Sequence, residues 1–361
     1  MKKIVTILGA RPQFVKGAVL SRVIANHNEI EEVIVHTGQH YDANMSAVFF
    51  EEMQIPSPKY NLNINGLGHG AMTGQMLEAI EKVLLAEQPD AVVIFGDTNS
   101  TIAGALAAKK LNVKVVHVEA GLRSFNMQMP EEINRILTDR ISDLLSCPTQ
   151  TAIDNLQKEG FGNLPNKVEQ HGDIMKDAVE FYSKASEEKA IILQEQNLTA
   201  NNFVLATIHR QENTDDKEKL ISIFKALDEI HQDKTVVLPL HPRTANKLKE
   251  YQIETNITLI NPVGYFDMLA LLKHCALVIT DSGGLQKEAF FNQKCCVIAR
   301  EETEWVELVE NGFASISGSL SETILKDYQN FIQLEKDFDM PLYGNNVGEQ
   351  IYQSIKKLIQ G

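Results

Sequence analysis

The chain has 361 residues, enough for two domains of ordinary size. Its composition, 43% hydrophobic and 23% charged, is that of a globular protein, and no run of about 18 apolar residues predicts a membrane-spanning helix. The formal net charge of -14 argues against nucleic acid or an anionic membrane surface as the main partner, so an anionic ligand would need a local positive pocket.

The first residues, MKKIVTILGARPQ, carry an apolar run too short for a signal peptide and no small-residue cleavage site, so we expect a first strand there. The cysteines form no CxxC pair, and we expect them to be reduced and mostly buried, as in a cytoplasmic protein. They are Cys147, Cys275, Cys295 and Cys296. The ten histidines form no HExxH pattern, so we expect no metal site.

Short apolar runs alternate with helical patterns along the chain. The runs are rich in β-branched residues, which is typical of parallel strands covered on both faces. In the first half they are KIVTIL (3–8), EVIVHTG (32–38), AVVIFGD (91–97) and VKVVHVEA (113–120). In the second half they are FVLATIH (203–209), TVVLPLH (235–241), ITLINP (257–262), ALVITD (276–281) and CCVIAR (295–300). Helical patterns such as 72–88, 101–111 and 219–232 separate them, which predicts an α/β protein with doubly wound sheets.

Both halves share this pattern without a visible sequence repeat. The hinge is expected around HGDIMKDAVEFY, with Gly172 as the breaker. We therefore predict an N-terminal Rossmann-like domain at 1–170 and a second one at 171–340, facing a central cleft. The last segment, 341–361, contains a predicted helix that could pack back on the N-terminal domain.

Charged residues gather where the predicted strands of the first half end, and parallel sheets bind ligands outside the carboxyl ends of their strands. LGARPQFVK places Arg11 and Lys16 at the start of a helix, whose free N–H groups attract anions. The alternative is an ordinary turn with a solvated arginine, and the loop is not the GxGxxG of dinucleotide sites. In GDTNST, Asp97 is either a ligand-facing acid or the N-cap of the next helix.

The stretch VVHVEAGLRSFNMQMPEEINR has the densest charge. Its charged residues are Glu119, Arg123, Glu131, Glu132 and Arg135. Glu119 follows a strand and either takes part in chemistry or pairs with Arg123 or Arg135. The two later glutamates begin a helix, where the helix dipole alone would explain them. Carboxylates that lie together raise one another's pKa, however, so Asp97, Glu119 and Glu131 are candidates for proton transfer.

The strand ends of the second half carry paired histidines and arginines and a glycine-rich turn. The pairs are His209 with Arg210 and His241 with Arg243. In VITDSGGLQKEAFF a strand ends at Asp281, and Ser282, Gly283 and Gly284 begin a helix whose backbone can approach a ligand closely. Glu288, four residues after Gly284, can accept both hydroxyls of a ribose. A plain glycine-containing turn is the alternative.

Together these motifs resemble the non-hydrolysing UDP-N-acetylglucosamine 2-epimerases of bacterial surface-polysaccharide synthesis. The resemblance covers essentially the whole chain and rests on LGARPQFVK, GDTNST, HVEAGLRS, PEEINR, the His209 motif, LHPR and TDSGGLQKEA. It implies the GT-B fold, in which two Rossmann-like domains close on a UDP-sugar. It also implies a homodimer and no bound cofactor or metal.

The resemblance implies roles for individual positions. Those expected around UDP are Arg11, Lys16, His209, Ser282, Gly283, Gly284, Glu288 and Arg300. Those expected to carry the chemistry are Asp97, Glu119 and Glu131, with His209 as a further candidate. Further contacts with the substrate are expected from Arg123, Arg135, Arg210, His241 and Arg243. Val263 and Met268 stand where other members contact the uracil side, so those contacts differ here.

In this family UDP is eliminated across C1–C2 of the sugar, and the resulting glycal takes UDP back while a proton returns to the other face of C2. This needs a base, an acid and stabilisation of positive charge at C1, which three carboxylates beside a diphosphate pocket could supply. A GT-B glycosyltransferase and a non-catalytic UDP-sugar-binding protein are the alternatives. Only an epimerase would change the sugar without an acceptor.

Two sequence differences from other members of this family concern which UDP-sugar is the substrate. Members acting on plain UDP-N-acetylglucosamine usually carry an Arg-Pro pair where this chain has Trp305 and Val306, and a different loop around Tyr41 and Asp42. These variations resemble the subgroup acting on UDP-2,3-diacetamido-2,3-dideoxy-glucuronic acid, with the plain sugar as the alternative. The C6 carboxylate would need a cation and the second acetamido group more apolar surface. Candidates are Arg123, Arg210 and Arg243 for the first, and Phe125, Met127 and Met129 for the second.

Overall fold

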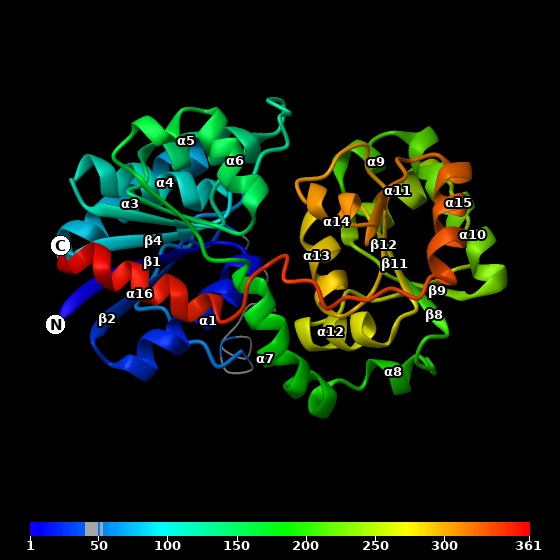
Figure 1. Ribbon diagram of the computed structural model, residues 1–361. Coiled ribbons are helices and arrows are strands. Elements are labelled where there is room, and N and C mark those ends of the chain that lie inside the picture. The colour runs from blue at the N-terminus through cyan, green and yellow to red at the C-terminus, as the bar shows by residue number, and fades with distance from the viewer. Residues whose placement is uncertain (40–49, 51–52) are drawn as a thin grey trace. The chain divides into compact units, whose positions relative to one another are not determined.

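The computed structural model describes residues 1–39, 50 and 53–361. It divides into two compact units: Met1–Ala178 together with Pro341–Gly361, and Val179–Met340. Each unit contains one parallel β-sheet with helices packed on it (Figure 1), which confirms the predicted α/β class. Within the described ranges, no helix is both long and apolar enough to cross a membrane.

The first unit has a seven-stranded sheet in the order β3-β2-β1-β4-β5-β6-β7. Its strands are β1 (Lys2–Leu8), β2 (Ile30–His36), β3 (Tyr60–Asn61), β4 (Ala91–Phe95), β5 (Lys114–Val118), β6 (Leu144–Cys147) and β7 (Lys167–Gln170). Its helices are α1 (Arg11–His27), α3 (His69–Glu87), α4 (Asn99–Lys110), α5 (Pro130–Ile141), α6 (Gln150–Lys158), the 3-10 helix η1 (Phe161–Asn163) and α16 (Val347–Gln360). The unit boundary falls inside α7 (Ile174–Lys189).

The second unit has a six-stranded sheet in the order β10-β9-β8-β11-β12-β13. Its strands are β8 (Phe203–Thr207), β9 (Thr235–Pro239), β10 (Thr258–Ile260), β11 (Leu277–Thr280), β12 (Cys296–Ile298) and β13 (Ala314–Ile316). Its helices are α8 (Ile192–Glu195), α9 (Gln211–Thr214), α10 (Lys217–Asp233), α11 (Pro242–Tyr251), α12 (Tyr265–His274), α13 (Gly283–Phe291), α14 (Val306–Glu310) and α15 (Ser321–Ile332).

Both sheets reverse their strand order at one place. In the first, β1 lies between β2 and β4; in the second, β8 lies between β9 and β11. The loops that follow the two strands beside such a reversal lead to opposite faces of the sheet, so ligands bind in the space between them. The fold therefore predicts one binding edge after β1 and β4 and a second after β8 and β11.

Every strand predicted from an apolar run is present. All five residues of β4, for example, are fully buried. The short strands β3, β6, β7 and β13 were not predicted. The edge strand β7 (KVEQ) has no fully buried residue, so it lacks the apolar run that identifies the interior strands.

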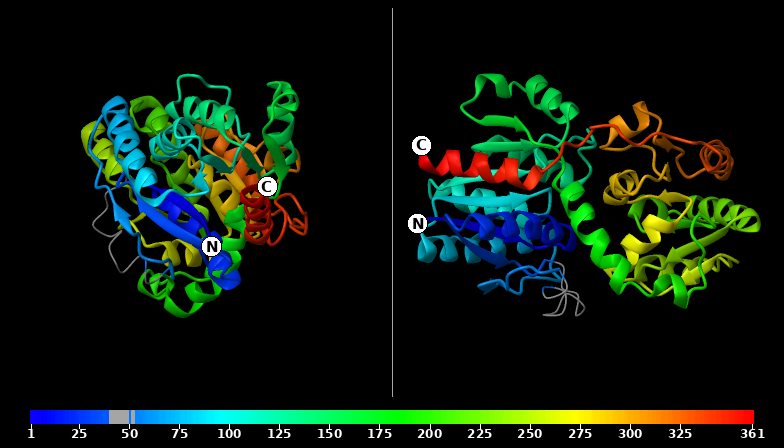
Figure 2. Two further views of the ribbon diagram at one scale, coloured as in Figure 1. Left: turned by 90° about the vertical axis from the view of Figure 1, so that its left-hand side faces the viewer. Right: turned by 60° about the horizontal axis from the view of Figure 1, so that its bottom comes forward.

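The last helix, α16, belongs to the first unit and lies beside α1 (Figure 2). The ring of Tyr352 stacks on His27 with centroids 4.2 Å apart, and its hydroxyl donates to Glu29 (3.1 Å). Gly172 lies where the returning chain passes. It has a φ of +104°, and a Cβ there would lie 2.2 Å from the carbonyl oxygen of Tyr343, so only glycine fits.

We expect Ile355→Ala to lower the free energy of unfolding by about 2–5 kcal/mol, because this side chain of α16 is fully buried and its truncation leaves a cavity. Lys357 is exposed on the same helix, and Lys357→Ala should change the stability by less than about 0.5 kcal/mol. Urea unfolding of the full chain, followed by circular dichroism, compares the two variants. Equal stabilities would show that the packing of α16 does not stabilise the protein.

Candidate functional site

Gln13 joins the two loops at the reversal point of the first sheet. Its Oε1 accepts hydrogen bonds from the backbone N–H groups of Gly9 (2.8 Å) and Ala10 (3.1 Å), just after β1. Its Nε2 donates to the carbonyl of Phe95 (2.6 Å) and to the hydroxyl of Thr101 (3.0 Å), at and beyond the end of β4. Because this side chain is buried, it holds the two loops together.

Lys16 and Glu119 form a buried ion pair at this edge. Lys16 comes from α1, which begins with the half-buried Arg11. Glu119 follows β5 and has a φ of +73°, a left-handed conformation that costs energy for any residue except glycine. The N–H groups of Glu119 and Ala120 both donate to the carbonyl of Ser146 (3.0 Å each), which holds this conformation. Strain of this kind is concentrated at functional sites.

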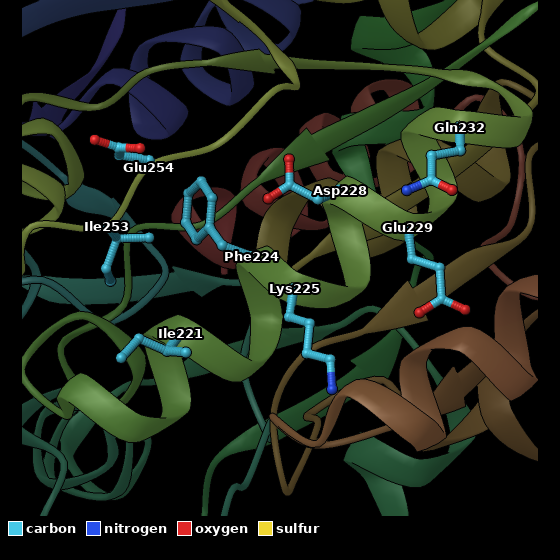
Figure 3. A pocket seen from close by; sticks show the side chains of 8 residues that line it. All are labelled: Ile221, Phe224, Lys225, Asp228, Glu229, Gln232, Ile253 and Glu254. Atoms are coloured by element: carbon cyan, nitrogen blue, oxygen red, sulfur yellow. The ribbon is translucent and has the colours of Figure 1, made fainter.

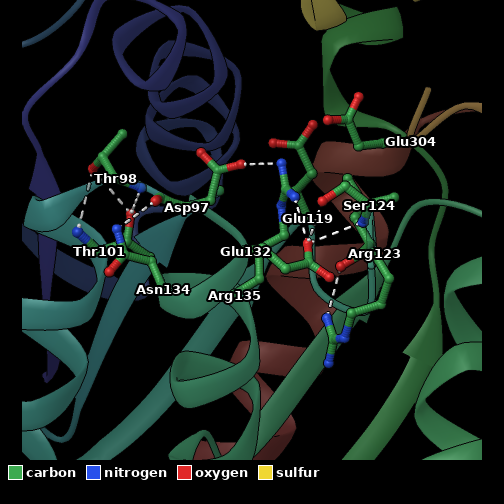
Figure 4. Close-up of polar contacts among 12 residues, drawn as sticks. Asp97, Thr98, Thr101, Glu119, Arg123, Ser124, Glu132, Asn134, Arg135 and Glu304 are labelled. Atoms are coloured by element: carbon green, nitrogen blue, oxygen red, sulfur yellow. Dashed lines mark hydrogen bonds and ion pairs between the residues drawn. The ribbon is translucent and has the colours of Figure 1, made fainter. Parts of the chain in front are cut away.

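Asp97 is not the N-cap of α4, because Thr98 occupies that position and accepts from the N–H of Thr101. The carboxylate of Asp97 instead accepts from Nη2 of Arg135 (2.6 Å), as Figure 4 shows. Its carbonyl accepts from Nδ2 of Asn134 (2.9 Å). The side chain of Asp97 remains 28% exposed, so a ligand can reach the carboxylate.

Glu132, rather than Glu131, enters the buried network behind this edge (Figure 4). Its carboxylate accepts from Nη1 of Arg135 (2.8 Å) and from the N–H groups of Ser124 (2.9 Å) and Phe125 (3.0 Å). Being fully buried, it shapes the connection between β5 and α5. Glu131 is half-buried and makes no hydrogen bond or ion pair with any residue that the structure describes. Two adjacent glutamates at a helix start carry no sequence signal that separates these roles.

The expected contact of Arg123 with the substrate is not supported by its geometry. The side chain is buried, and its guanidinium donates to Asp139 (2.7 Å), to the carbonyl of Leu122 (2.7 Å) and twice to Glu159 (2.6 and 2.8 Å). These bonds use most of its donors. Arg123 is therefore a structural residue of the β5–α5 connection.

In the second unit, Asp281 organises the loop after β8. It is fully buried and accepts from the N–H groups of His209 (3.0 Å) and Arg210 (2.9 Å) and from the side-chain amide of Asn213 (3.1 Å). Asn213 also donates to the carbonyl of Ala299 (2.8 Å), just after β12. The ends of β8, β11 and β12 are thus tied together. The sequence located Asp281 but did not predict this role.

His209 is half-buried beside this aspartate, with the ring of His241 5.6 Å away between centroids. Burial lowers the pKa of His209 and outweighs the opposite effect of Asp281, so the ring is neutral near pH 7. A neutral imidazole can both donate and accept a hydrogen bond. His241 is exposed and caps α11, its Nδ1 accepting from the N–H of Arg243 (3.2 Å).

The first turn of α13 is suited to binding an anion. It begins with Gly283 and Gly284, and a Cβ placed on Gly283 would lie 3.7 Å from Nη1 of Arg300 and 3.8 Å from Nη2 of Arg210. A carboxylate oxygen of Glu304 would lie 3.4 Å from the same Cβ, so two guanidiniums and one carboxylate flank the helix start, where N–H groups and the helix dipole attract negative charge. Glu288 is half-buried in the next turn.

Behind this turn, Arg300 is oriented by the carboxylate of Glu304 (3.3 Å). Trp305, the residue that differs from the Arg-Pro pair of other members, is buried with the ammonium of Lys287 4.1 Å from its ring centroid. The tryptophan therefore supports α13 through a cation–π contact. Ser282 occupies the N-cap position of α13 and is half-buried.

Arg243 donates to Thr214 (2.9 Å) and Asp215 (2.6 Å), so it joins α11 to the region after α9. Its guanidinium is thus held by the protein, and the expected contact of Arg243 with the substrate stays a prediction. Tyr41 and Asp42 lie outside the described residues.

Several hollows open on the second unit, and two of them differ in their position relative to the sheet. One, of about 610 Å³, lies at the carboxyl ends of β9 and β10 and includes Leu240 and Val263 in its lining. The other, of about 560 Å³, lies between α10 and the turn that precedes β10 (Figure 3). Lys225, Asp228 and Glu229 surround it, without an excess of positive charge. Of these two, the first is on the side of the sheet where parallel strands bind ligands.

Comparison with known proteins gives matches over almost the whole chain. The family model described as UDP-N-acetylglucosamine 2-epimerase matches residues 22–356. A Pseudomonas aeruginosa protein named UDP-2,3-diacetamido-2,3-dideoxy-D-glucuronate 2-epimerase is 49% identical over 358 residues, which cover 99% of this chain and 100% of that protein. A Methanocaldococcus jannaschii protein named UDP-N-acetylglucosamine 2-epimerase is 42% identical over 359 residues, 97% of each chain.

Solved structures that resemble this chain also cover almost its whole length. The structure of Methanocaldococcus jannaschii UDP-GlcNAc 2-epimerase in complex with UDP-GlcNAc and UDP matches with a TM-score of 0.89 at 41% identity, covering 98% of this chain and 99% of that one. A Staphylococcus aureus structure, MnaA with UDP, matches with a TM-score of 0.88 at 31% identity, covering 100% and 97%. The fold is GT-B, and the chain belongs to the UDP-N-acetylglucosamine 2-epimerase family, whose members are isomerases.

Proposed function

We propose that this protein is a UDP-N-acetyl-sugar 2-epimerase, which inverts C2 by eliminating UDP and adding it back through a glycal, for surface polysaccharide synthesis. The supporting observation is the different chemistry of the two reversal points. The first has the carboxylates of Asp97 and Glu119 at its edge, with Glu131 in the first turn of α5, and the second has a helix start at Gly283 beside the guanidiniums of Arg210 and Arg300. The mechanism uses neither a cofactor nor a metal.

We assign UDP to the second reversal point. The N–H groups at the start of α13, together with Arg300, supply positive charge for the diphosphate. Glu288, one turn further along the helix, accepts the ribose hydroxyls. The neutral ring of His209 donates a hydrogen bond to a phosphate oxygen. The assignment of Arg11 and Lys16 to the diphosphate follows from the family resemblance.

The three carboxylates of the first unit have different roles in the proposed reaction. Glu131 has no partner among the described residues, so it is the carboxylate most available for proton transfer. Asp97 and Glu119 are each held by a cation, Arg135 and Lys16 respectively. Oriented negative charge of this kind stabilises the positive charge that develops at C1 when the bond to UDP breaks.

We propose UDP-2,3-diacetamido-2,3-dideoxy-glucuronate as the preferred substrate, with plain UDP-N-acetylglucosamine as the alternative. The 49% identity to an enzyme named for the first sugar supports this order. Of the three cations considered for its C6 carboxylate, Arg123 and Arg243 are held by protein carboxylates. Arg210 therefore becomes the candidate. Phe125 and Met127 are 73% and 59% exposed and could contact the acetamido methyl groups.

We also propose a homodimer in the cytoplasm. On α5, Ile133 and Leu137 are 41% and 51% exposed and lie one turn apart, which leaves an apolar strip that a second copy could cover.

The four cysteines are free and buried, which supports the proposed location in the cytoplasm, because that compartment keeps thiols reduced.

Incubation of the protein with either UDP-sugar in D2O, without an acceptor, tests the reaction. We expect the manno epimer with deuterium at C2, because elimination removes the original proton and solvent supplies the new one. Proton NMR follows the product, and initial rates give kcat/KM for both sugars. Epimerisation that retains the original hydrogen would contradict the elimination route. No change of the sugar would favour a transferase or a binding protein, and a higher kcat/KM for the plain sugar would contradict the substrate preference.

Each of Asp97→Asn, Glu119→Gln and Glu131→Gln should lower kcat by at least about 10²-fold, the usual scale for a positioned acid or base. Glu188→Gln is the control, because Glu188 is an exposed carboxylate of α7. Steady-state turnover is the measurement, and UDP binding should persist in the Glu131 variant. If all three variants turned over like the control, these carboxylates would not belong to the mechanism.

Glu288→Ala and His209→Ala should weaken UDP binding by about 1–3 kcal/mol each, through lost hydrogen bonds to charged groups. Titration calorimetry with UDP measures the change. Glu322→Ala, an exposed carboxylate at the start of α15, serves as the control. Unchanged affinity in both test variants would place the nucleotide elsewhere.

A further inference from the structure

His117 lies in β5, between β4 and β6 in the first sheet, and the proposed chemistry does not use it. The residue is fully buried. Its Nδ1 lies 2.7 Å from a carboxylate oxygen of Asp139, and its Nε2 lies 2.7 Å from the carbonyl oxygen of Gly96. Because both ring nitrogens have an oxygen within hydrogen-bond distance, these two contacts decide how many protons the ring carries.

Both partners of this ring can only accept hydrogen bonds. A backbone carbonyl carries no proton. Burial alone would raise the pKa of Asp139, but that pKa lies below its ordinary value, and the guanidinium of Arg123 (2.7 Å) and the N–H of Gly121 (3.2 Å) both donate to the group, so it is a carboxylate. A neutral ring would turn one nitrogen lone pair toward an oxygen, which is unfavourable in a buried site. An imidazolium donates to both oxygens.

The charges around the ring balance an imidazolium. Asp139 and Glu159 are the nearby carboxylates, and Arg123 donates to both (2.7 and 2.6 Å). With His117 charged, two cations therefore match two anions. Cys147 of β6 lies near the same aspartate, but burial raises the pKa of its thiol well above the ordinary value, so it stays neutral.

The carbonyl that His117 binds belongs to the peptide that joins Gly96 to Asp97. Gly96 has a φ of +62°, and its N–H donates to the carbonyl of Val118 (3.0 Å). The carbonyl of Asp97 is held in turn by Asn134 (2.9 Å). A glycine in this conformation can rotate easily, so these hydrogen bonds decide where the carboxylate of Asp97 lies.

We propose that His117 is a doubly protonated positioning residue, whose Nε2–H fixes the Gly96–Asp97 peptide and thereby the carboxylate of Asp97. Its effect on turnover rests on the proposed epimerase function, whereas its protonation state does not. His117 itself transfers no proton in this proposal.

Two variants separate the two hydrogen bonds of the ring. The amide of glutamine reaches the place of Nε2 and can still donate to Gly96, whereas the amide of asparagine reaches only the place of Nδ1. We expect His117→Gln to keep kcat within about 10-fold of wild type and His117→Asn to lose at least about 10²-fold, with KM changed little in both. His171→Asn, a buried histidine between Ser146 and Ser354, controls for the loss of a buried ring. Melting temperatures establish that the variants fold.

Nitrogen NMR of the full chain with labelled histidine gives a readout that needs no substrate. The signal that is lost in His117→Gln should show both ring nitrogens protonated at pH 7, as the two acceptor oxygens require. A neutral ring near pH 7, or equal kcat in the two variants, would overturn the proposal. If neither variant folded, the protonation state of the wild-type ring would decide. Absence of C2 inversion with either sugar would contradict the proposed function and leave the imidazolium signal intact.

Discussion

The reversal of strand order beside β1 and beside β8 is the constraint on which the rest of the structure depends. Parallel strands must be joined by crossovers, and at a reversal the loops that follow two neighbouring strands leave toward opposite faces of the sheet. Space for a ligand opens between those loops. Asp97 and His209 each stand two residues beyond a strand beside a reversal, β4 and β8 respectively. Their chemistry is therefore available to a ligand because of the topology.

Charge at the first reversal point is arranged in pairs that are fixed before a ligand arrives. Lys16 of α1 holds Glu119, and Arg135 of α5 holds Asp97. The cations come from helices packed on the sheet, so the carboxylates need little reorganisation during a reaction, which is how protein charges lower barriers most effectively. The same arrangement keeps ordered cations at this edge in a chain with a net charge of -14.

The sequence predicts the features whose signals are local. Apolar, β-branched runs identify the interior strands, and the glycines after Asp281 identify the anion-binding turn. The structural role of Arg123 could not be predicted, because its partners Asp139 and Glu159 lie 16 and 36 positions further along the chain and meet it only in the packed fold. For the same reason the sequence assigns Glu131 to the site by resemblance but gives no indication that Glu132 is buried.

The loop after β4 in the first unit and the loop after β8 in the second are fixed by groups of opposite hydrogen-bonding character. In the first, donors from Gln13 and His117 hold the carbonyls of Phe95 and Gly96. In the second, the acceptor Asp281 holds the N–H groups of the loop after β8. Those backbone N–H groups are consequently unavailable to a ligand, whereas the N–H groups at the start of α13 are the ones to which we assign UDP under the proposed function. In that proposal the buried aspartate directs the nucleotide to one of the two loops at its own reversal point.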